Sequence, residues 1–154
     1  MGKTSSLVKK LARDYPDINF QASNDTYWSS KEQSIYMDDQ CDTYILLHEL
    51  AHASLQHADH SSDAALLRME QEAWQHAIEE LAPRYGLTIP EDVVDDHLES
   101  YREWLHARSK CPHCSQTGVQ TDQKKYRCIA CSNEWHTNTA KRTELRRYAT
   151  KKHL

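Results

Sequence analysis

The segment His48-Glu49-Leu50-Ala51-His52 has the pattern HExxH, whose residue types and spacing suit zinc chemistry. A helix turns by about 100° per residue, so side chains four positions apart lie on one face, one turn apart. His48 and His52 can therefore bind one zinc ion. Glu49 lies where it can take a proton from a zinc-bound water, whose pKa the metal lowers to near 7. The pattern predicts a catalytic zinc with His48 and His52 as ligands and Glu49 as general base.

A third ligand is expected downstream, because a catalytic zinc usually keeps three protein ligands and one open position. On the helix expected at residues 63–82, Glu70 shares a face with an apolar stripe, whereas Glu72 lies on a polar face. A carboxylate on an apolar face needs a cation, and zinc would be that cation. The stripe favours Glu70 as the third ligand. Four more downstream residues remain candidates: His57, His60, Glu72 and His76.

The segment 68–77, RMEQEAWQHA, resembles the E-x-x-A-x-x-F-A segment of the ImmA/IrrE-type metallopeptidases, with His76 where that family has Phe. The resemblance implies that Glu70 is the third zinc ligand and that the substrate is a DNA-binding repressor. The layout of the chain, with HExxH in its first half and cysteines near its end, resembles the SprT-like metallopeptidases instead. That resemblance implies a third histidine from the loop holding His57 and His60, and proteolysis near DNA. Both families imply a small α+β zincin domain with short strands beside the active-site helix.

Two CxxC pairs lie near the end of the chain, Cys111-Pro-His-Cys114 and Cys128-Ile-Ala-Cys131, with 13 residues between them. Four thiolates at this spacing suit tetrahedral zinc, and the segment between the pairs suits a β-hairpin. A site with four thiolates is closed, so it stabilises the fold and does no catalysis. The sequence therefore predicts two Zn²⁺ ions per chain, one catalytic and one structural.

Charge is distributed unevenly along the chain. Residues 1–109 hold 9 Lys and Arg against 20 Asp and Glu, a balance of −11, and residues 110–154 hold 10 against 3, a balance of +7. A basic tail on an acidic body indicates an anionic partner, of which DNA is the usual one; the alternative is a solvated basic terminus. The residues expected to contact DNA are Lys124, Lys125, Arg127, Trp135, Lys141, Arg142, Arg146 and Arg147.

Periodicity and breaker residues predict the elements that position these side chains. We expect a helix over residues 5–14 that Pro16 ends, then two or three short strands within residues 18–37. Helices follow over residues 43–57 and 63–82, the latter stopping at Pro83, and a fourth helix begins at Pro90. The fold class is α+β: a small zincin-like domain of helices with a short mixed sheet, followed by a zinc ribbon with four cysteine ligands. The expected division is 1–109 for the zincin-like domain, 110–136 for the ribbon and 137–154 for a basic tail.

The start of the chain, MGKTSSLVKKLARDYPD, contains no apolar signal core, and no stretch approaches the roughly 18 apolar residues of a membrane span. Two CxxC pairs in such a protein more often bind metal than form disulfides, so we expect a cytoplasmic location and no membrane partner. The expected function is that of a zinc metallopeptidase hydrolysing a DNA-associated protein. The alternative is a nucleic-acid-associated regulator or adaptor whose zincin domain is metal-bound but weakly active. The presence of Glu49 favours catalysis.

Overall fold

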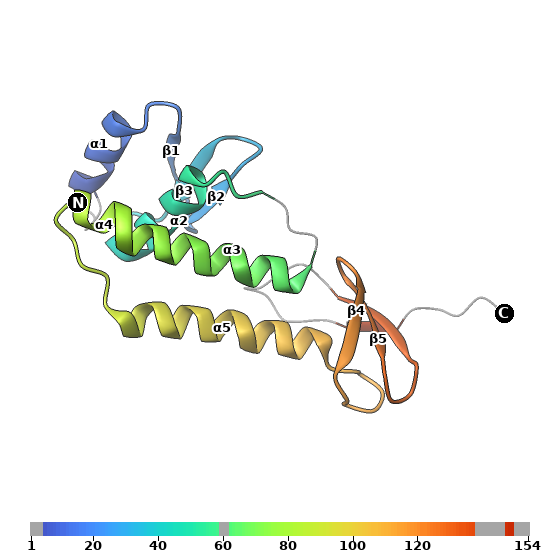
Figure 1. Cartoon of the computed structure of the whole chain (residues 1–154). Helices are drawn as coiled ribbons and strands as arrows, with labels where there is room; N and C mark the ends of the chain where they lie inside the picture. The colour runs from blue at the N-terminus through green and yellow to red at the C-terminus, as the bar shows by residue number, and fades with distance from the viewer. Residues whose placement is uncertain (1–4, 59–61, 138–146, 150–154) are drawn as a thin grey trace. The chain divides into compact units, whose positions relative to one another are not determined.

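The computed structural model describes residues 5–58, 62–137 and 147–149, the last three by their backbone alone. Helices and two small sheets make the chain α+β, which confirms the predicted fold class (Figure 1). The described chain divides into two compact units. One contains residues up to 58 and from 68 to 94, and the other contains residues 62–67 and those from 95 onward. Within these ranges no helix combines the length and apolar character that crossing a membrane requires.

The first unit opens with α1 (Ser5–Asp14) and a three-stranded sheet, β1 (Asn19–Ala22), β2 (Tyr27–Ser29) and β3 (Ser34–Met37). The middle strand, β3, pairs parallel with β1 and antiparallel with β2, so the sheet is mixed, as the sequence predicts. Ile35 on β3 and Leu11 on α1 are completely buried. The helix ends before Pro16, which cannot continue it.

Helix α2 (Thr43–Ser54) carries the HExxH segment and packs against β2 and β3, as Figure 1 shows. Most of its residues are apolar or small, and they are buried on nearly every side of the helix. The buried positions are Leu46, Leu47, His48, Leu50, Ala51, His52 and Ala53. A helix buried all round fixes its side chains by packing, so His48 and His52 are held rigidly.

A second helical stretch follows as α3 (Asp63–His76), a π-helical turn η1 (Ala77–Leu81) and α4 (Ala82–Arg84). The stretch runs past Pro83, where the sequence predicts its end, and stops before Gly86, whose φ is +68°. Pro83 sits in the first turn of α4, where its missing N–H is tolerated. The π turn η1 lies directly before α4, so the α-helix starts anew at Ala82, with Pro83 in its first turn.

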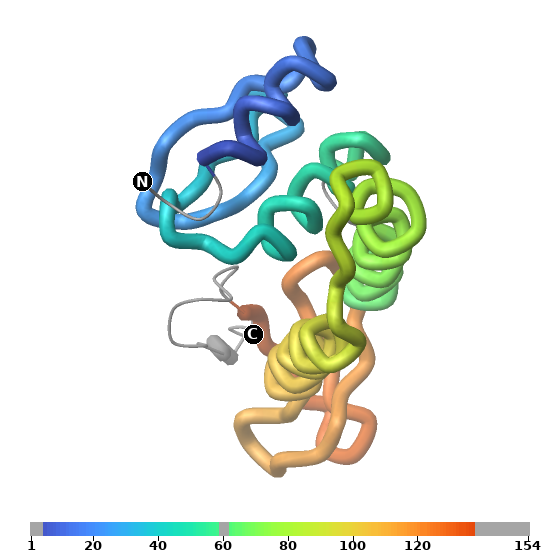
Figure 2. The backbone as a smooth tube through the Cα atoms, turned by 90° about the vertical axis from the view of Figure 1, so that its left-hand side faces the viewer, coloured from blue at the N-terminus to red at the C-terminus, as the bar shows by residue number. Residues whose placement is uncertain are grey.

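The second unit consists mainly of α5 (Glu91–Ser109) and a four-stranded antiparallel sheet. Its strands are β4 (Gly118–Asp122), β5 (Lys125–Cys128), β6 (Glu134–Thr137) and β7 (Arg147–Ala149), in that order. In Figure 2 the yellow tube of α5 continues through a light-orange loop into the orange hairpin of β4 and β5. The pairing of Gly118 with Cys128 and Val119 with Arg127 confirms the predicted hairpin between the CxxC pairs.

Trp135 and Tyr126 form the small core of this sheet together with Cys111 and Cys128. The Trp135 indole N–H donates to the carbonyl of Arg108 over 3.0 Å, which ties the sheet to the end of α5. Arg108 is itself buried: its guanidinium lies 4.6 Å from the ring centre of Trp104 and 3.6 Å from the Asp63 carboxylate. Its Nε also donates to Thr137 Oγ1 on β6 over 3.3 Å, so Arg108 is a second link between α5 and the sheet.

Candidate metal centres

His48, His52 and Glu70 meet inside the first unit. The two histidines lie one turn apart on α2, and Glu70 comes from α3. His48 Nε2 lies 2.8 Å from Glu70 Oε2, and His52 Nε2 lies 3.3 Å from Glu70 Oε1. All three side chains are buried, so the carboxylate sits between two imidazoles with little contact with water.

The charge on Glu70 is stabilised by its two neighbours. Burial alone would raise the pKa of the Glu70 carboxyl, but the hydrogen bonds with His48 and His52 outweigh burial and hold that pKa well below its usual range. Burial likewise works against a charge on His52, but the hydrogen bond and negative charge of Glu70 raise the pKa of this histidine. The carboxylate is therefore ionised in a buried place, where it needs a positive partner: a protonated imidazole or a metal ion.

Two aromatic residues fix the orientation of the HExxH side chains. The ring of Trp74 stacks on His48 with 4.2 Å between centroids and 9° between planes. The backbone N–H of Trp28, on β2, donates to Glu49 Oε2 over 3.0 Å. The other oxygen, Glu49 Oε1, lies 3.7 Å from His48 Nδ1. Glu49 thus lies beside the histidine cluster with one oxygen held by the strand.

His57 lies behind His52, on the side away from Glu70. Helix α2 ends in a Schellman turn: Gln56 takes a left-handed φ of 53°, and the His57 N–H donates to the His52 carbonyl over 2.9 Å. This turn brings the Nδ1 atoms of His52 and His57 within 2.9 Å of each other, and His57 Nε2 lies 3.2 Å from Glu72 Oε2. His57 therefore contacts the far nitrogen of His52, not the nitrogen that faces Glu70.

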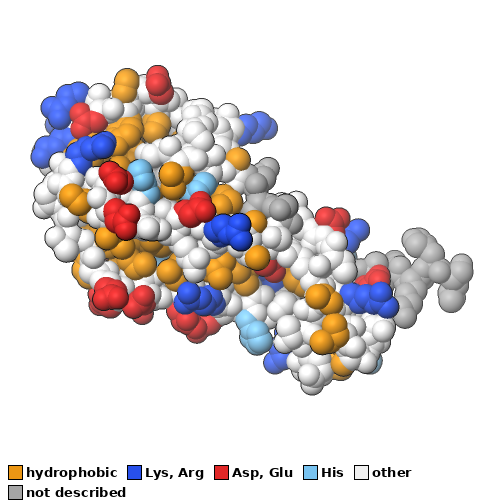
Figure 3. Space-filling model, viewed as in Figure 1, with side chains coloured by type: hydrophobic (Ala, Val, Ile, Leu, Met, Phe, Trp, Pro, Cys, Tyr) orange, Lys and Arg blue, Asp and Glu red, His pale blue; other side chains and the backbone are white. Residues whose placement is uncertain are grey.

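The remaining candidates for a third ligand lie elsewhere. His60 falls outside the described residues. Glu72 is half exposed, and His76 lines an open pocket of about 260 Å³. Three of the six residues that line this pocket are glutamates, and Figure 3 shows acidic side chains over α3. The lining residues are Leu55, Glu72, Gln75, His76, Glu79 and Glu80, which include none of the three clustered donors.

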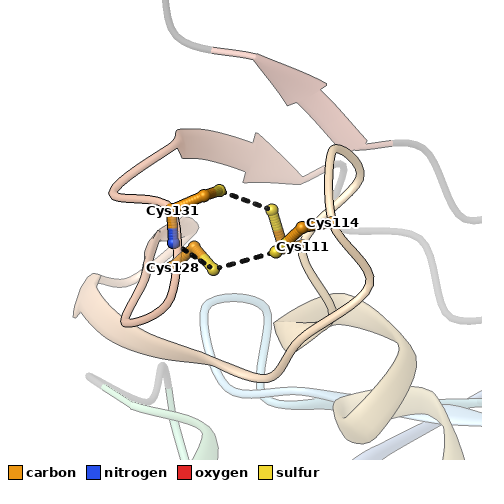
Figure 4. Close-up of side chains that lie close together, drawn as sticks. All are labelled: Cys111, Cys114, Cys128 and Cys131. Atoms are coloured by element: carbon orange, nitrogen blue, oxygen red, sulfur yellow. Dashed lines mark hydrogen bonds between the residues drawn. The ribbon is translucent and has the colours of Figure 1, made fainter.

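The four cysteines of the second unit form a compact cluster that could hold a metal ion such as zinc. Figure 4 shows their side chains converging from two turns. Cys111 Sγ lies 3.8 Å from Cys131 Sγ, and Cys114 Sγ lies 3.4 Å from Cys128 Sγ. Ligand sulfurs around a tetrahedral zinc, each about 2.3 Å from the metal, lie roughly 3.8 Å apart, so the cluster fits this geometry.

The two CxxC turns have the same backbone structure. The N–H of Ser115 donates to the Cys111 carbonyl and that of Ser132 to the Cys128 carbonyl, and both serines have positive φ, 67° and 63°. Burial opposes ionisation of Cys111, but backbone N–H donors outweigh it and lower the pKa of this thiol to about 6. Backbone donors also lower the pKa of Cys128. Thiolates, the form that binds metal, are thus favoured at the first cysteine of each turn.

The residues predicted to contact DNA fall into three groups. Lys124, Lys125 and Arg127 are exposed on the hairpin of β4 and β5. Trp135, also expected to contact DNA, is completely buried: its ring fills the core of the sheet, as an aromatic on a half-buried strand often does, and is not exposed for stacking on a base. The remaining predicted contacts are not described in their side chains: Lys141, Arg142 and Arg146 lie outside the described residues, and Arg147 is described only by its backbone in β7.

Sequence reasoning misses what Trp28, Trp74 and His57 contribute to the first cluster. Trp28 acts through its backbone N–H, and a residue's amide gives no signal in a sequence unless its strand pairing is known. The sequence indicates His57 only as a candidate ligand, and the glutamine before it gives no sign of the left-handed turn that places it behind His52. A glycine at that position would have been the usual signal.

Comparison of the chain with protein-family models, with curated proteins and with solved structures finds no match.

Proposed function

We propose that the protein is a zinc-dependent metallopeptidase whose catalytic zinc is held by His48, His52 and Glu70. The observation that carries this proposal is the buried Glu70 carboxylate between the Nε2 atoms of two histidines. Two imidazoles and one carboxylate are a common ligand set for catalytic zinc. A tetrahedral zinc with ligands at about 2.0–2.1 Å separates its donor atoms by roughly 3.3 Å, so the 3.3 Å between His52 Nε2 and Glu70 Oε1 fits, whereas the 2.8 Å between His48 Nε2 and Glu70 Oε2 would have to lengthen on metal binding.

The side chains around this cluster suit peptide hydrolysis. When bound, zinc would supply a water of lowered pKa and polarise the scissile carbonyl. Glu49 would accept the proton of the attacking water and return it to the leaving amine. Its Oε2 accepts the Trp28 amide N–H, which orients the carboxylate beside His48. Trp74 keeps the His48 ring in the plane that directs Nε2 at Glu70.

The substrate we propose is a DNA-associated protein, because exposed basic residues of the ribbon would bring the enzyme to DNA. Lys124, Lys125 and Arg127 all point to solvent on one hairpin. The same residues support the second candidate, a nucleic-acid-associated regulator whose metal centre turns over weakly. We further infer a reducing, cytoplasmic location, because the four ribbon thiols must remain reduced to bind metal.

The decisive experiment compares the zinc-loaded full chain with Glu49→Gln on unfolded protein substrates and peptide libraries. Loss of the general base should lower the hydrolysis rate by about 10²–10⁴-fold while zinc content stays unchanged. Glu80→Gln, an exposed glutamate of η1, is the matched control and should keep full activity. If the wild-type chain binds zinc at His48 and His52 but hydrolyses nothing, the peptidase proposal fails and the regulator remains.

A further inference from the structure

A line of close contacts runs from the surface of the first unit to its buried cluster. The half-exposed carboxylate of Glu72 lies 3.2 Å from His57 Nε2. His57 Nδ1 lies 2.9 Å from His52 Nδ1, and His52 Nε2 faces Glu70. His57 is held at this place by more than its ring, since its carbonyl accepts the indole N–H of Trp28 over 2.9 Å.

The direction of these hydrogen bonds follows from the first partner. An ionised carboxylate only accepts, so the proton between Glu72 and His57 belongs to His57 Nε2. A neutral His57 then has a bare Nδ1 that accepts a hydrogen bond. Two bare nitrogens 2.9 Å apart would repel each other, so His52 Nδ1 must carry a proton and donate it. A His52 ring that keeps only this Nδ1 proton, once a metal ion takes the place of any proton on Nε2, has the Nε2 lone pair available as a ligand.

We propose that Glu72 and His57 are positioning residues that hold His52 in the Nδ1–H tautomer, with its Nε2 ready to bind metal. This assignment rests on the proposed function, because it treats His52 as a zinc ligand. Glu70 acts in the opposite sense when no metal is bound, since it accepts a hydrogen bond from a proton on His52 Nε2. The pair formed by Glu72 and His57 shifts this balance toward the metal-binding form and also fixes the plane of the ring.

The expected size of the effect follows from other metal centres, where loss of a group that orients a ligand typically costs 10–100-fold in metal affinity. His57→Phe keeps an aromatic ring but removes the acceptor for the His52 proton, so zinc affinity should fall by about 10–100-fold. Glu72→Leu removes the acceptor for the His57 proton and should act in the same direction. Glu72→Gln keeps an accepting oxygen and should recover most of the loss.

The test measures zinc affinity of the full chain by competition with a chromophoric chelator. Cobalt(II) used in place of zinc distinguishes the two centres, because only the cysteine cluster gives intense thiolate charge-transfer bands. Glu79→Leu, in η1 about two turns after Glu72, is the matched control and should leave the affinity unchanged. Imidazole ¹⁵N NMR of the metal-free protein, at a pH where His52 is neutral, gives its Nδ1–H share, which His57→Phe should lower.

The outcomes separate this proposal from the peptidase proposal. If His57→Phe binds zinc as tightly as the wild type, or leaves the Nδ1–H share of His52 unchanged, the positioning role is disproved. If these effects appear but the wild type hydrolyses no peptide, only the peptidase proposal fails. A wild-type chain that binds no zinc at His52 would overturn both. A lower melting temperature with unchanged affinity and tautomer would mean that His57 is a packing residue only.

Discussion

The carboxylate of Glu70 is a buried charge whose partners are the Nε2 atoms of His48 and His52. Replacing it with glutamine keeps its shape and removes the charge. We expect Glu70→Gln to weaken zinc binding at this cluster by more than about 100-fold, because losing a direct ligand should cost more than losing a group that merely orients one. Equilibrium dialysis with zinc measures this. Glu80→Gln, an exposed glutamate, should bind like the wild type, and equal affinities for both variants would contradict the assignment.

Single residues could be predicted where periodicity alone decides their position. Glu70 and Glu72 differ by two positions on one helix, and the apolar stripe correctly placed the first inside and the second at the surface. The apolar stripe does not predict which residue Glu72 contacts. Its contact with His57 depends on the turn that ends α2, a tertiary feature that helical spacing does not encode. The buried ring of Trp135 was missed for a related reason, since its strand partners decide which face it occupies.

Among the elements, β4 leaves room for the ring of Trp135 because Gly118 has no side chain. A Cβ added at Gly118 would overlap Cη2 of Trp135 and lie 2.8 Å from the carbonyl oxygen of Arg127. Neither neighbour can move easily, because Trp135 is completely buried and the carbonyl is backbone. Gly118→Ala should therefore destabilise the second unit by about 1–3 kcal/mol or more.

Thermal unfolding of the zinc-loaded chain, followed by tryptophan fluorescence, measures this effect. Val119→Ala is the control, because Val119 lies next along the strand and is half exposed, so its truncation should change stability by less than about 0.5 kcal/mol. If the two variants unfold alike, Trp135 has room to shift and the packing described above is not tight.

The elements themselves were largely predictable. Helix α1, the mixed sheet and the hairpin of the ribbon follow from turn residues and alternating apolar residues, which act locally. The passage of the helix through Pro83 was not predictable. Proline removes one N–H, and the sequence does not show that a π turn will re-form the backbone hydrogen bonds just before it. Local sequence rules therefore identify Pro83 as a helix breaker, but they do not predict the π turn that lets the helix continue through it.

At the scale of the molecule, the two donor clusters differ in chemistry, so we predict two zinc ions per chain. Each ion should be lost when a ligand of its own cluster is replaced. Protein purified without chelator should contain about two equivalents of zinc. Cys111→Ser should remove the ribbon metal and unfold the second unit, because a closed thiolate site contributes to folding, whereas His48→Ala should remove one metal and leave that unit folded. Metal analysis combined with circular dichroism distinguishes these results. One equivalent in the wild type, unaffected by His48→Ala, would exclude the first centre.

The charge imbalance of the chain leads to a prediction about DNA. Residues 110–154 carry +7 and residues 1–109 carry −11, so binding should depend on the ribbon side. We expect affinity to fall by about a hundredfold between 50 and 200 mM salt, and the double variant Lys124→Gln with Lys125→Gln to reduce the salt slope by about 2. Fluorescence anisotropy with labelled duplex measures both.

Lys31→Gln, in the first unit, is the control and should leave the salt slope unchanged. Because Trp135 and Tyr126 are buried, single strands should bind no better than duplex through stacking by these two rings. Equal binding by the double variant and the wild type would mean that the basic hairpin is a solvated surface and not a DNA contact.

The ligands of each donor cluster come from a short stretch of sequence, and this affects how each cluster can form during translation. His52 and Glu70 are 18 residues apart, and Cys111 and Cys131 are 20 apart. The entropy lost on closing a loop grows only with the logarithm of its length, and loops of this size are among the easier ones to close. Synthesis proceeds from the N-terminus, so the histidine cluster is complete before the ribosome reaches the first ribbon cysteine. Each cluster can therefore assemble from its own stretch of nascent chain, and the order in which the centres take up metal would follow the order of translation.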